Sequence, residues 1–364
     1  MSIKHLAMAT AFFFAGGSAL ANAQDRVVNV FNWSDYIDDS ILADFTKETG
    51  IKVVYDVFDS NEILETKLLA GGTGYDVVVP TATFLQRQIA AGVFQKLDKS
   101  KLPNMSNLWD EITTRVATYD PGNEYAVDYM WGTTGIGYNV EKVKEILGTD
   151  EKPTWDVLLN PEVAAKFKDC GIHVLDSATD VVPSVLLYLG LNPDSHDAAD
   201  LAKAEEAMLA VRPFIRKFHS SEYINALANG DICLAMGYSG DVFQARDRAA
   251  EAAAGVTVDY AIPPLGAQMW FDVMAIPADA PHVEEAHEFI NYLMKPEVIA
   301  KATDYVFYAN GNKASQEFIS KDVLDDTAIY PPDDVMKKLF TTTPFSARDQ
   351  RALTRMWTKV VTGQ

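Results

Sequence analysis

The sequence predicts an α/β protein of two domains, with a mainly parallel sheet covered by helices on both faces. Its 364 residues are too many for one core of ordinary size, and a 48% hydrophobic content is typical of a soluble globular protein. Between residues 26 and 80, strand-like apolar runs alternate with helix-like segments of about ten residues. This alternation is typical of right-handed crossovers between parallel strands.

Three predicted strands open the chain, and two helices separate them. The strands are residues 26–33 (RVVNVFNW), 51–58 and 76–80 (DVVVP). The first helix begins at residues 38–40 (DDS), which can cap it, and ends at Gly50. The second begins at Asp59, which forms an Asp variant of the capping box with Glu62, and closes at residues 71–72.

The pattern changes at residues 128–137 (DYMWGTTGIG), which are aromatic and glycine-rich and predict a segment that crosses between domains. Helices and strands continue beyond it. The predicted helices are 202–211, 223–229, 283–295 and a segment restarted by Pro296, and the predicted strands are 232–236 (ICLAM) and 256–262.

The first residues have the organisation of a secretory signal. Lys4 precedes an apolar run at residues 6–15, and residues 21–23 (ANA) form a small-x-small cleavage site. The apolar run is about half of the ~20 residues needed to span a bilayer. We therefore predict a signal peptide of residues 1–23 cleaved after Ala23, with a retained anchor as the alternative.

The net charge limits the classes of molecule that the protein surface can bind. Loss of Lys4 with the signal peptide takes the net charge from −20 to −21, which argues against binding nucleic acid or anionic lipid through the general surface.

Cys170 and Cys233 are the only cysteines. Export favours a disulfide between them, and two buried free thiols are the alternative.

Three segments pair large rings with a carboxylate: residues 31–36 (FNWSDY), 237–241 (GYSGD) and 270–272 (WFD). The first two follow predicted strands, as does Thr81. Since ligands of open parallel sheets bind outside the carboxyl ends of the strands, these segments are expected to meet in a crevice. Alternatively, the rings are core residues and each Asp caps a helix.

Aromatic rings interleaved with carboxylates suit an aliphatic chain that carries ammonium groups. Primary amines have pKa values of about 10.4, so both ends of a diamine are charged at neutral pH. Burying those charges without partners would cost several kcal/mol per ion, which carboxylates must offset. Ring faces exclude water from the methylenes and add roughly 0.5 to 2 kcal/mol each through cation–π contact.

Catalytic and metal-binding patterns are absent from the sequence. It contains no H-E-x-x-H, C-x-x-C or G-x-S-x-G motif and no D-x-D-x-D-G calcium loop. His219 stands beside Ser220 and Ser221, an arrangement more typical of a hydrogen-bonded structural histidine. We therefore predict no enzyme activity, no metal and no cofactor; a secreted two-lobed enzyme is the alternative.

Several longer motifs carry a family resemblance. They are NWSDYI, GIKVVYDVFDSNEILETKLLAG, YDVVVP, AGVFQKLDKSKLP, YMWGTTGIGYN, FHSSEYINALANGDIC and AIYPPDDV. Over essentially the whole mature chain, the sequence resembles the periplasmic polyamine-binding proteins of ABC transporters, nearest the putrescine-binding branch. The resemblance implies a two-lobed, type II Venus-flytrap fold. Its expected lobes are 24–129 plus 260–304 and 130–259 plus 305–364, with hinges near 129–133, 256–260 and 304–308.

The resemblance also implies a ligand-binding set. The expected residues are Trp33, Ser34, Asp35, Tyr36, Thr81, Asp180, Tyr238, Asp241, Trp270, Asp272 and Tyr308. Asp35, Asp241 and Asp272 would hold ammonium groups. Four positions depart from the putrescine-binding pattern: Thr81 replaces Ser, Asp180 replaces Glu, Tyr238 replaces Trp and Trp270 replaces Phe. These differences leave open which polyamine fits.

By resemblance, the protein would be a periplasmic receptor, acting as a monomer, that delivers putrescine to an inner-membrane ABC permease. Alternatives are a receptor for spermidine, cadaverine or agmatine, and a polyamine sensor. A receptor of the same fold for ferric ion or a sugar is a further alternative. It is disfavoured because iron would need paired tyrosines and sugars would want more amides.

Overall fold

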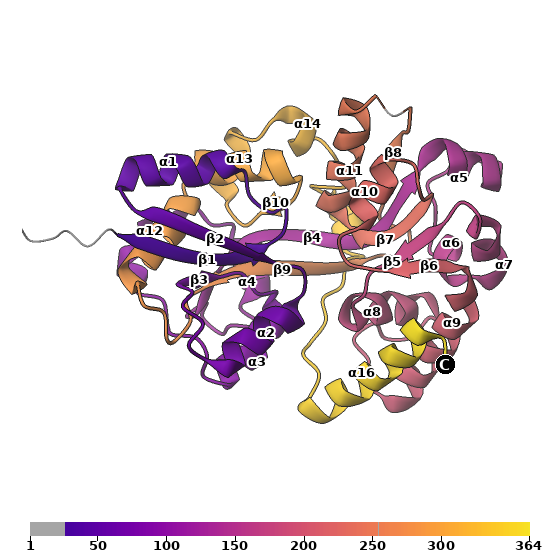
Figure 1. Cartoon of the computed structure of the whole chain (residues 1–364), viewed down its shortest axis with the longest axis horizontal. Coiled ribbons are helices and arrows are strands. Elements are labelled where there is room, and N and C mark those ends of the chain that lie inside the picture. Colours follow the sequence, from indigo (N-terminus) through magenta and orange to yellow (C-terminus); the bar gives the residue numbers. More distant parts are fainter. Residues whose placement is uncertain (1–25, 254) are drawn as a thin grey trace, which may run out of the picture.

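The computed structural model describes residues 26–253 and 255–364, so the predicted signal peptide lies outside the described residues. Figure 1 shows two lobes side by side, each a sheet covered by helices, with long strands joining them in the middle. The predicted α/β class with two lobes is confirmed. The residue boundaries proposed for the lobes and hinges stay a prediction.

The first lobe is built on the strand order β2-β1-β3-β9-β4. Its strands are β1 (Val27–Trp33), β2 (Lys52–Phe58), β3 (Val77–Val78), β9 (Gln268–Ala275) and the first part of β4 (Ala126–Asn139), joined at β4 by the short β10 (Ala309–Asn310). Strand β1 pairs in parallel with β2 and β3, whereas β9 runs antiparallel to both β3 and β4.

The second lobe continues the same sheet in the order β4-β7-β5-β6. Its strands are β5 (Ile172–Val174), β6 (Ile215–Phe218), β7 (Leu234–Tyr238), β8 (Val258–Ala261) and the second part of β4. Strand β5 is parallel to β6 and β7, and β4 is antiparallel to β7 and β8.

Strand β4 belongs to both lobes. Its first part pairs with β9 as far as Thr134, and the pairing with β7 begins at that same residue. All 14 residues of β4 are buried. The parallel pairs expected from the sequence therefore occupy the outer parts of the sheet, and the centre is antiparallel because β4 and β9 run through it in opposite directions.

Helices cover both faces of each lobe. In the first lobe, α1 and α13 lie on one side of the sheet and α2 and α3 on the other (Figure 1). The helices associated with this lobe are α1 (Asp39–Thr49), α2 (Asn61–Ala70), α3 (Ala82–Ala90), α4 (Asp110–Val116), α12 (Val283–Leu293) and α13 (Pro296–Val306). Those of the second lobe are α5 (Val140–Leu147), α6 (Asp156–Leu159), α7 (Pro161–Ala164), α8 (Ala178–Tyr188), α9 (Ala198–Val211), α10 (Tyr223–Ala228), α11 (Ser239–Glu251) and α16 (Ala347–Thr362). Two short helices, α14 (Lys321–Leu324) and α15 (Asp333–Met336), lie on the segment that leads to α16.

Capping explains where the first two helices begin. Asp38 accepts the backbone N–H of Ser40 and caps α1, and Gly50 ends it in the left-handed conformation, as predicted. The predicted cap of α2 is wrong: Ser60, not Asp59, accepts the N–H of Ile63. A serine in the extended conformation fills that role, and it leaves the neighbouring carboxylate free for other contacts.

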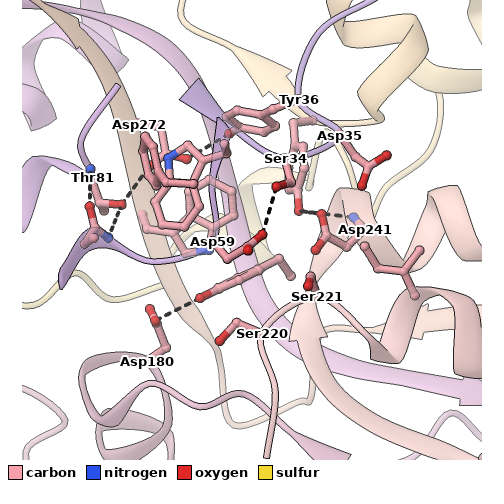
Figure 2. Close-up of a pocket in the computed structure, with 17 residues that line it drawn as sticks. Ser34, Asp35, Tyr36, Asp59, Thr81, Asp180, Ser220, Ser221, Asp241 and Asp272 are labelled. Atoms are coloured by element: carbon pink, nitrogen blue, oxygen red, sulfur yellow. Dashed lines mark hydrogen bonds between the residues drawn. The ribbon is translucent and has the colours of Figure 1, made fainter. Parts of the chain in front are cut away.

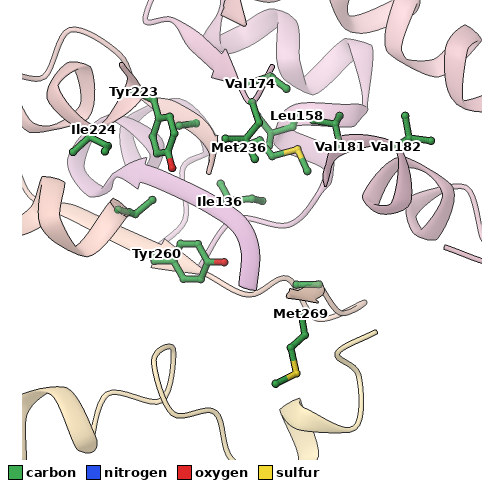
Figure 3. Packing of buried hydrophobic residues seen from close by; sticks show 14 of the residues in the cluster. Ile136, Leu158, Val174, Val181, Val182, Tyr223, Ile224, Met236, Tyr260 and Met269 are labelled. Carbon is green, nitrogen blue, oxygen red and sulfur yellow. The ribbon is translucent and has the colours of Figure 1, made fainter. Parts of the chain in front are cut away.

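The second lobe has a dense hydrophobic core around β4, β5, β7 and α8. Ile136, Val174, Val181 and Met236 from these elements pack together (Figure 3). This core holds the second-lobe strand ends, including the end of β7, at fixed positions.

The predicted disulfide is confirmed. Cys170 and Cys233 are linked, with 5.5 Å between their Cα atoms and a sequence separation of 63 residues. The bond ties the segment before β5 to the segment before β7. In the chain-entropy model, closing a loop of this length stabilises the fold by about 4 kcal/mol.

Candidate ligand-binding site

A pocket lies between the two lobes and opens to solvent. Figure 2 shows carboxylates and rings from both lobes pointing into it. All eleven residues expected from the sequence line this pocket: Trp33, Ser34, Asp35, Tyr36, Thr81, Asp180, Tyr238, Asp241, Trp270, Asp272 and Tyr308. Their roles toward a ligand stay a prediction, but the structure brings the whole set together.

Several pocket residues lie at or just after strand ends, as predicted. Trp33 ends β1, Thr81 immediately precedes α3, and Tyr238 ends β7. Asp241 follows in the first turn of α11. Trp270 and Asp272 differ from this pattern, because they lie in the middle of β9, where the strand passes beneath the pocket.

Asp272 is the most enclosed carboxylate of the pocket, with 5% of its surface exposed. Its Oδ1 accepts the hydroxyl of Thr81 at 2.7 Å, and its Oδ2 accepts the hydroxyl of Tyr36 at 2.9 Å. Burial raises the pKa of Asp272 to about 7, and the two hydroxyl donors limit the rise. This carboxyl is therefore close to half-ionised at neutral pH and favours a cationic partner.

Asp241 faces the pocket from the second lobe. The hydroxyls of Tyr223 and Tyr308 donate to its Oδ2 and Oδ1, each at 2.7 Å. Burial raises the pKa of Asp241 to about 6, again opposed by the two hydroxyl donors. Each lobe thus contributes one carboxylate that accepts two hydroxyl donors, and Asp241 is half-buried where Asp272 is buried.

Asp180 lies in the first turn of α8 and contacts the pocket residue Tyr238. It accepts the hydroxyl of Tyr238 at 3.0 Å and the hydroxyl of Ser177. Burial raises its pKa above the usual range for Asp. Its side chain therefore fixes the ring of Tyr238 as well as lining the pocket.

Asp35 differs from the other carboxylates because it lies at the mouth of the pocket. Its side chain is 51% exposed, and its Oδ1 accepts a hydrogen bond from Nη2 of Arg248 at 3.1 Å. Gln244 also donates to the backbone carbonyl of Asp35 at 3.4 Å. Since Gln244 and Arg248 belong to α11, this contact joins the first lobe to the second. No sequence signal identified Arg248.

The aromatic residues form a connected wall. Ring centroids are 5.6 Å apart for Tyr238 and Trp270, 5.2 Å for Trp270 and Tyr308, and 5.3 Å for Tyr308 and Tyr36. All three pairs are edge-to-face, an arrangement favoured by the ring quadrupoles. Tyr36 thus contributes a ring as well as a hydroxyl.

Gly132 on β4 provides the space for two of these rings. A Cβ atom at this position would lie 2.8 Å from Trp270 and 2.9 Å from Tyr308. We expect Gly132→Ala to displace both rings, to cost about 1 to 3 kcal/mol of stability and to weaken ligand binding. Thermal unfolding and calorimetry would measure the two effects.

Gly137→Ala is the matched control on the same strand. A Cβ atom there would lie 2.6 Å from Val242, away from the pocket rings. This variant should lose stability but keep its affinity. Equal affinities in Gly132→Ala and the wild type would show that the rings tolerate displacement.

Asp128 on β4 is a buried carboxyl for which no hydrogen-bond partner is found among the described residues. Burial and the nearby Asp272 raise its pKa well above the usual range. The native state therefore binds more protons than the unfolded state above pH 4, so this group's contribution to stability falls as pH rises. We expect the stability of Asp128→Asn relative to the wild type to increase by up to about 1.4 kcal/mol per pH unit. Denaturant unfolding from pH 5 to 8 would measure this slope, and parallel curves would contradict it.

Six pocket residues were not expected from the sequence: Phe58, Asp59, Asn61, Ser220, Ser221 and Ile224. Asp59 follows a predicted strand, as Asp35 does, and this signal could have identified it. It accepts the hydroxyl of Ser34 at 2.8 Å. Ser221 is held by a structural histidine, since its backbone N–H donates to Nδ1 of His219 at 3.1 Å.

Within the part of the chain that the structure describes, no helix is both long and apolar enough to cross a bilayer. In the same residues, no group of three or more His, Cys, Asp or Glu side chains is arranged to hold a metal ion.

Comparison with known proteins identifies the family. Residues 40–331 match the model of the bacterial extracellular solute-binding proteins. The chain belongs to this family. Among solute-binding proteins, it is 54% identical to the putrescine-binding periplasmic protein SpuD of Pseudomonas aeruginosa, over 94% of each chain. It is also 54% identical to the putrescine-binding periplasmic protein PotF of Escherichia coli, over 94% of this chain and 93% of the relative.

A solved solute-binding protein has the same fold. The spermidine/putrescine ABC transporter substrate-binding protein PotD of Streptococcus pneumoniae aligns with a TM-score of 0.76 and 28% identity. The alignment covers 93% of this chain and 99% of that one.

Proposed function

We propose that this solute-binding protein captures putrescine, or a closely related polyamine, between its lobes in the periplasm and delivers it to an ABC permease of the inner membrane. The observation that carries the proposal is the pair Asp272 and Asp241. Asp272 is buried and Asp241 is half-buried, the two lie on opposite lobes, and aromatic rings lie between them. The names of the two relatives at 54% identity support the same ligand.

In this proposal, the two carboxylates bind the ammonium ends and the rings enclose the methylenes. A diammonium ligand compensates both buried charges at once. Because it contacts both lobes, it binds the closed arrangement better than an open one, and this difference in affinity drives closure. Asp35 and Arg248 then close the mouth by joining the lobes. No step breaks or forms a covalent bond.

Calorimetry with putrescine, cadaverine, spermidine and agmatine tests the proposal. At least one of the four should bind with a dissociation constant well below the millimolar range. Butylamine, which lacks the second ammonium group, and 1,4-butanediol, which lacks both, are the matched control ligands and should bind far more weakly. Failure of all four amines to bind would refute the function.

A further inference from the structure

Tyr223 lies outside the pocket and yet contacts two of its residues. It opens α10 two residues after the pocket residue Ser221, and its side chain is fully buried. Its hydroxyl donates to Oδ2 of Asp241 at 2.7 Å and accepts the backbone N–H of Tyr238 at 3.0 Å. We propose that Tyr223 is a positioning residue that sets both the carboxylate of Asp241 and the ring of Tyr238 for the ligand, an inference that rests on the proposed function.

Through these two hydrogen bonds, the hydroxyl of Tyr223 holds two pocket residues, Asp241 and Tyr238. Tyr238 ends β7, and its N–H would be a buried donor without a partner if the hydroxyl were absent. The other oxygen of Asp241 is bound by Tyr308, which itself lines the pocket and meets the ligand. Asp241 therefore has two hydroxyl donors, and a ligand can contact Tyr308 but not Tyr223.

Gly237 gives the ring of Tyr223 its place against β7. A Cβ atom at Gly237 would lie 2.5 Å from Cε2 of Tyr223, so any other residue there would push the ring aside. Gly237 thus leaves space for the ring of Tyr223, and the next residue, Tyr238, is the one whose backbone N–H that tyrosine binds.

Removal of the Tyr223 hydroxyl should change the pKa of Asp241, which a loss of packing alone would not do. A hydroxyl that donates to a carboxylate favours the ionised form, so its loss raises the pKa of Asp241. We expect Tyr223→Phe to bind putrescine about tenfold more weakly at pH 7, given the usual strength of a hydrogen bond to a charged group. The loss should grow at pH 6 and shrink at pH 8.5, where Asp241 is ionised in both proteins.

Tyr260→Phe is the matched control. Tyr260 on β8 is also fully buried in the second lobe, but its hydroxyl donates to the carbonyl of Thr133 at 3.0 Å and does not line the pocket. Both variants remove one buried hydroxyl and keep the ring. Tyr260→Phe should lose comparable stability while it retains the affinity and pH profile of the wild type. If the two variants changed affinity equally at each pH, Tyr223 would have only a structural role and the proposal would fail.

A second measurement does not depend on the ligand. Carbon-13 NMR titration of the side-chain carboxyl of Asp241 in the free protein should report a higher pKa in Tyr223→Phe than in the wild type or Tyr260→Phe. An unchanged titration would overturn the positioning role even if putrescine binds. Conversely, a wild type that binds no polyamine would refute the proposed function, whereas the titration would still report on Tyr223.

Discussion

Asp272→Asn is expected to bind putrescine two to nearly four orders of magnitude more weakly than the wild type. Asp272 is 5% exposed, so its replacement leaves a buried ammonium group without a counter-charge. Breaking one partner of a buried ion pair costs about 3 to 5 kcal/mol. The amide keeps the shape and can still accept one hydroxyl, so the fold should persist. Calorimetry gives the affinity, and circular dichroism checks the fold.

Asp35→Asn provides the contrast for this experiment. Asp35 is 51% exposed and already paired with Arg248, and solvent screens such pairs. Exposed ion pairs contribute about 1 kcal/mol or less, which corresponds to a loss of roughly fivefold or smaller. If Asp35→Asn weakened binding as much as Asp272→Asn, the ligand would sit nearer the mouth than we propose.

Putrescine affinity is expected to fall steeply in acid, by roughly three orders of magnitude between pH 7.5 and pH 5. The pKa values of Asp272 and Asp241 in the free protein are about 7 and about 6, and an ammonium ligand requires both carboxylates to be ionised. Binding in acid must therefore first remove protons from the pocket. Since the amines stay charged throughout this range, the effect belongs to the protein.

Calorimetry in buffers of different ionisation enthalpy measures the proton count directly. We expect proton release on binding near pH 6.5 and little release above pH 8. The Asp272→Asn variant should release fewer protons, because Asn does not titrate. An affinity that is constant from pH 5 to pH 7.5 would mean that both carboxyls are already ionised in the free protein.

Local signals in the sequence predicted much of the fold. Helix α1 illustrates this, since Asp38 and Gly50 mark its ends by capping chemistry that depends on a few neighbouring residues. Strand β9 was not predicted, because all eight of its residues are buried and the apolar and polar positions do not alternate. Its antiparallel direction depends on its long-range pairing with β4, which no local pattern encodes.

The pocket was predicted as a set, but its internal organisation was not. Motifs with rings and carboxylates identified Asp241 and Asp272 without distinguishing them from Asp35. Only the packing separates the buried Asp272 and the half-buried Asp241 from the exposed Asp35, which pairs with Arg248. Tyr223 carried no signal, because a tyrosine at the start of a helix is ordinary until its hydroxyl is seen beside Asp241.

The shared strand β4 also determines when the protein can fold. Val78 of β3 pairs with Ala275 of β9, and β9 in turn pairs with β4, so the first lobe needs residues nearly 200 positions apart in sequence. A chain that has emerged only as far as β4 exposes unpaired strand edges, which are prone to aggregation. Contacts of such long sequence separation also slow folding. A delay between synthesis and folding is therefore expected from the same strand that joins the lobes.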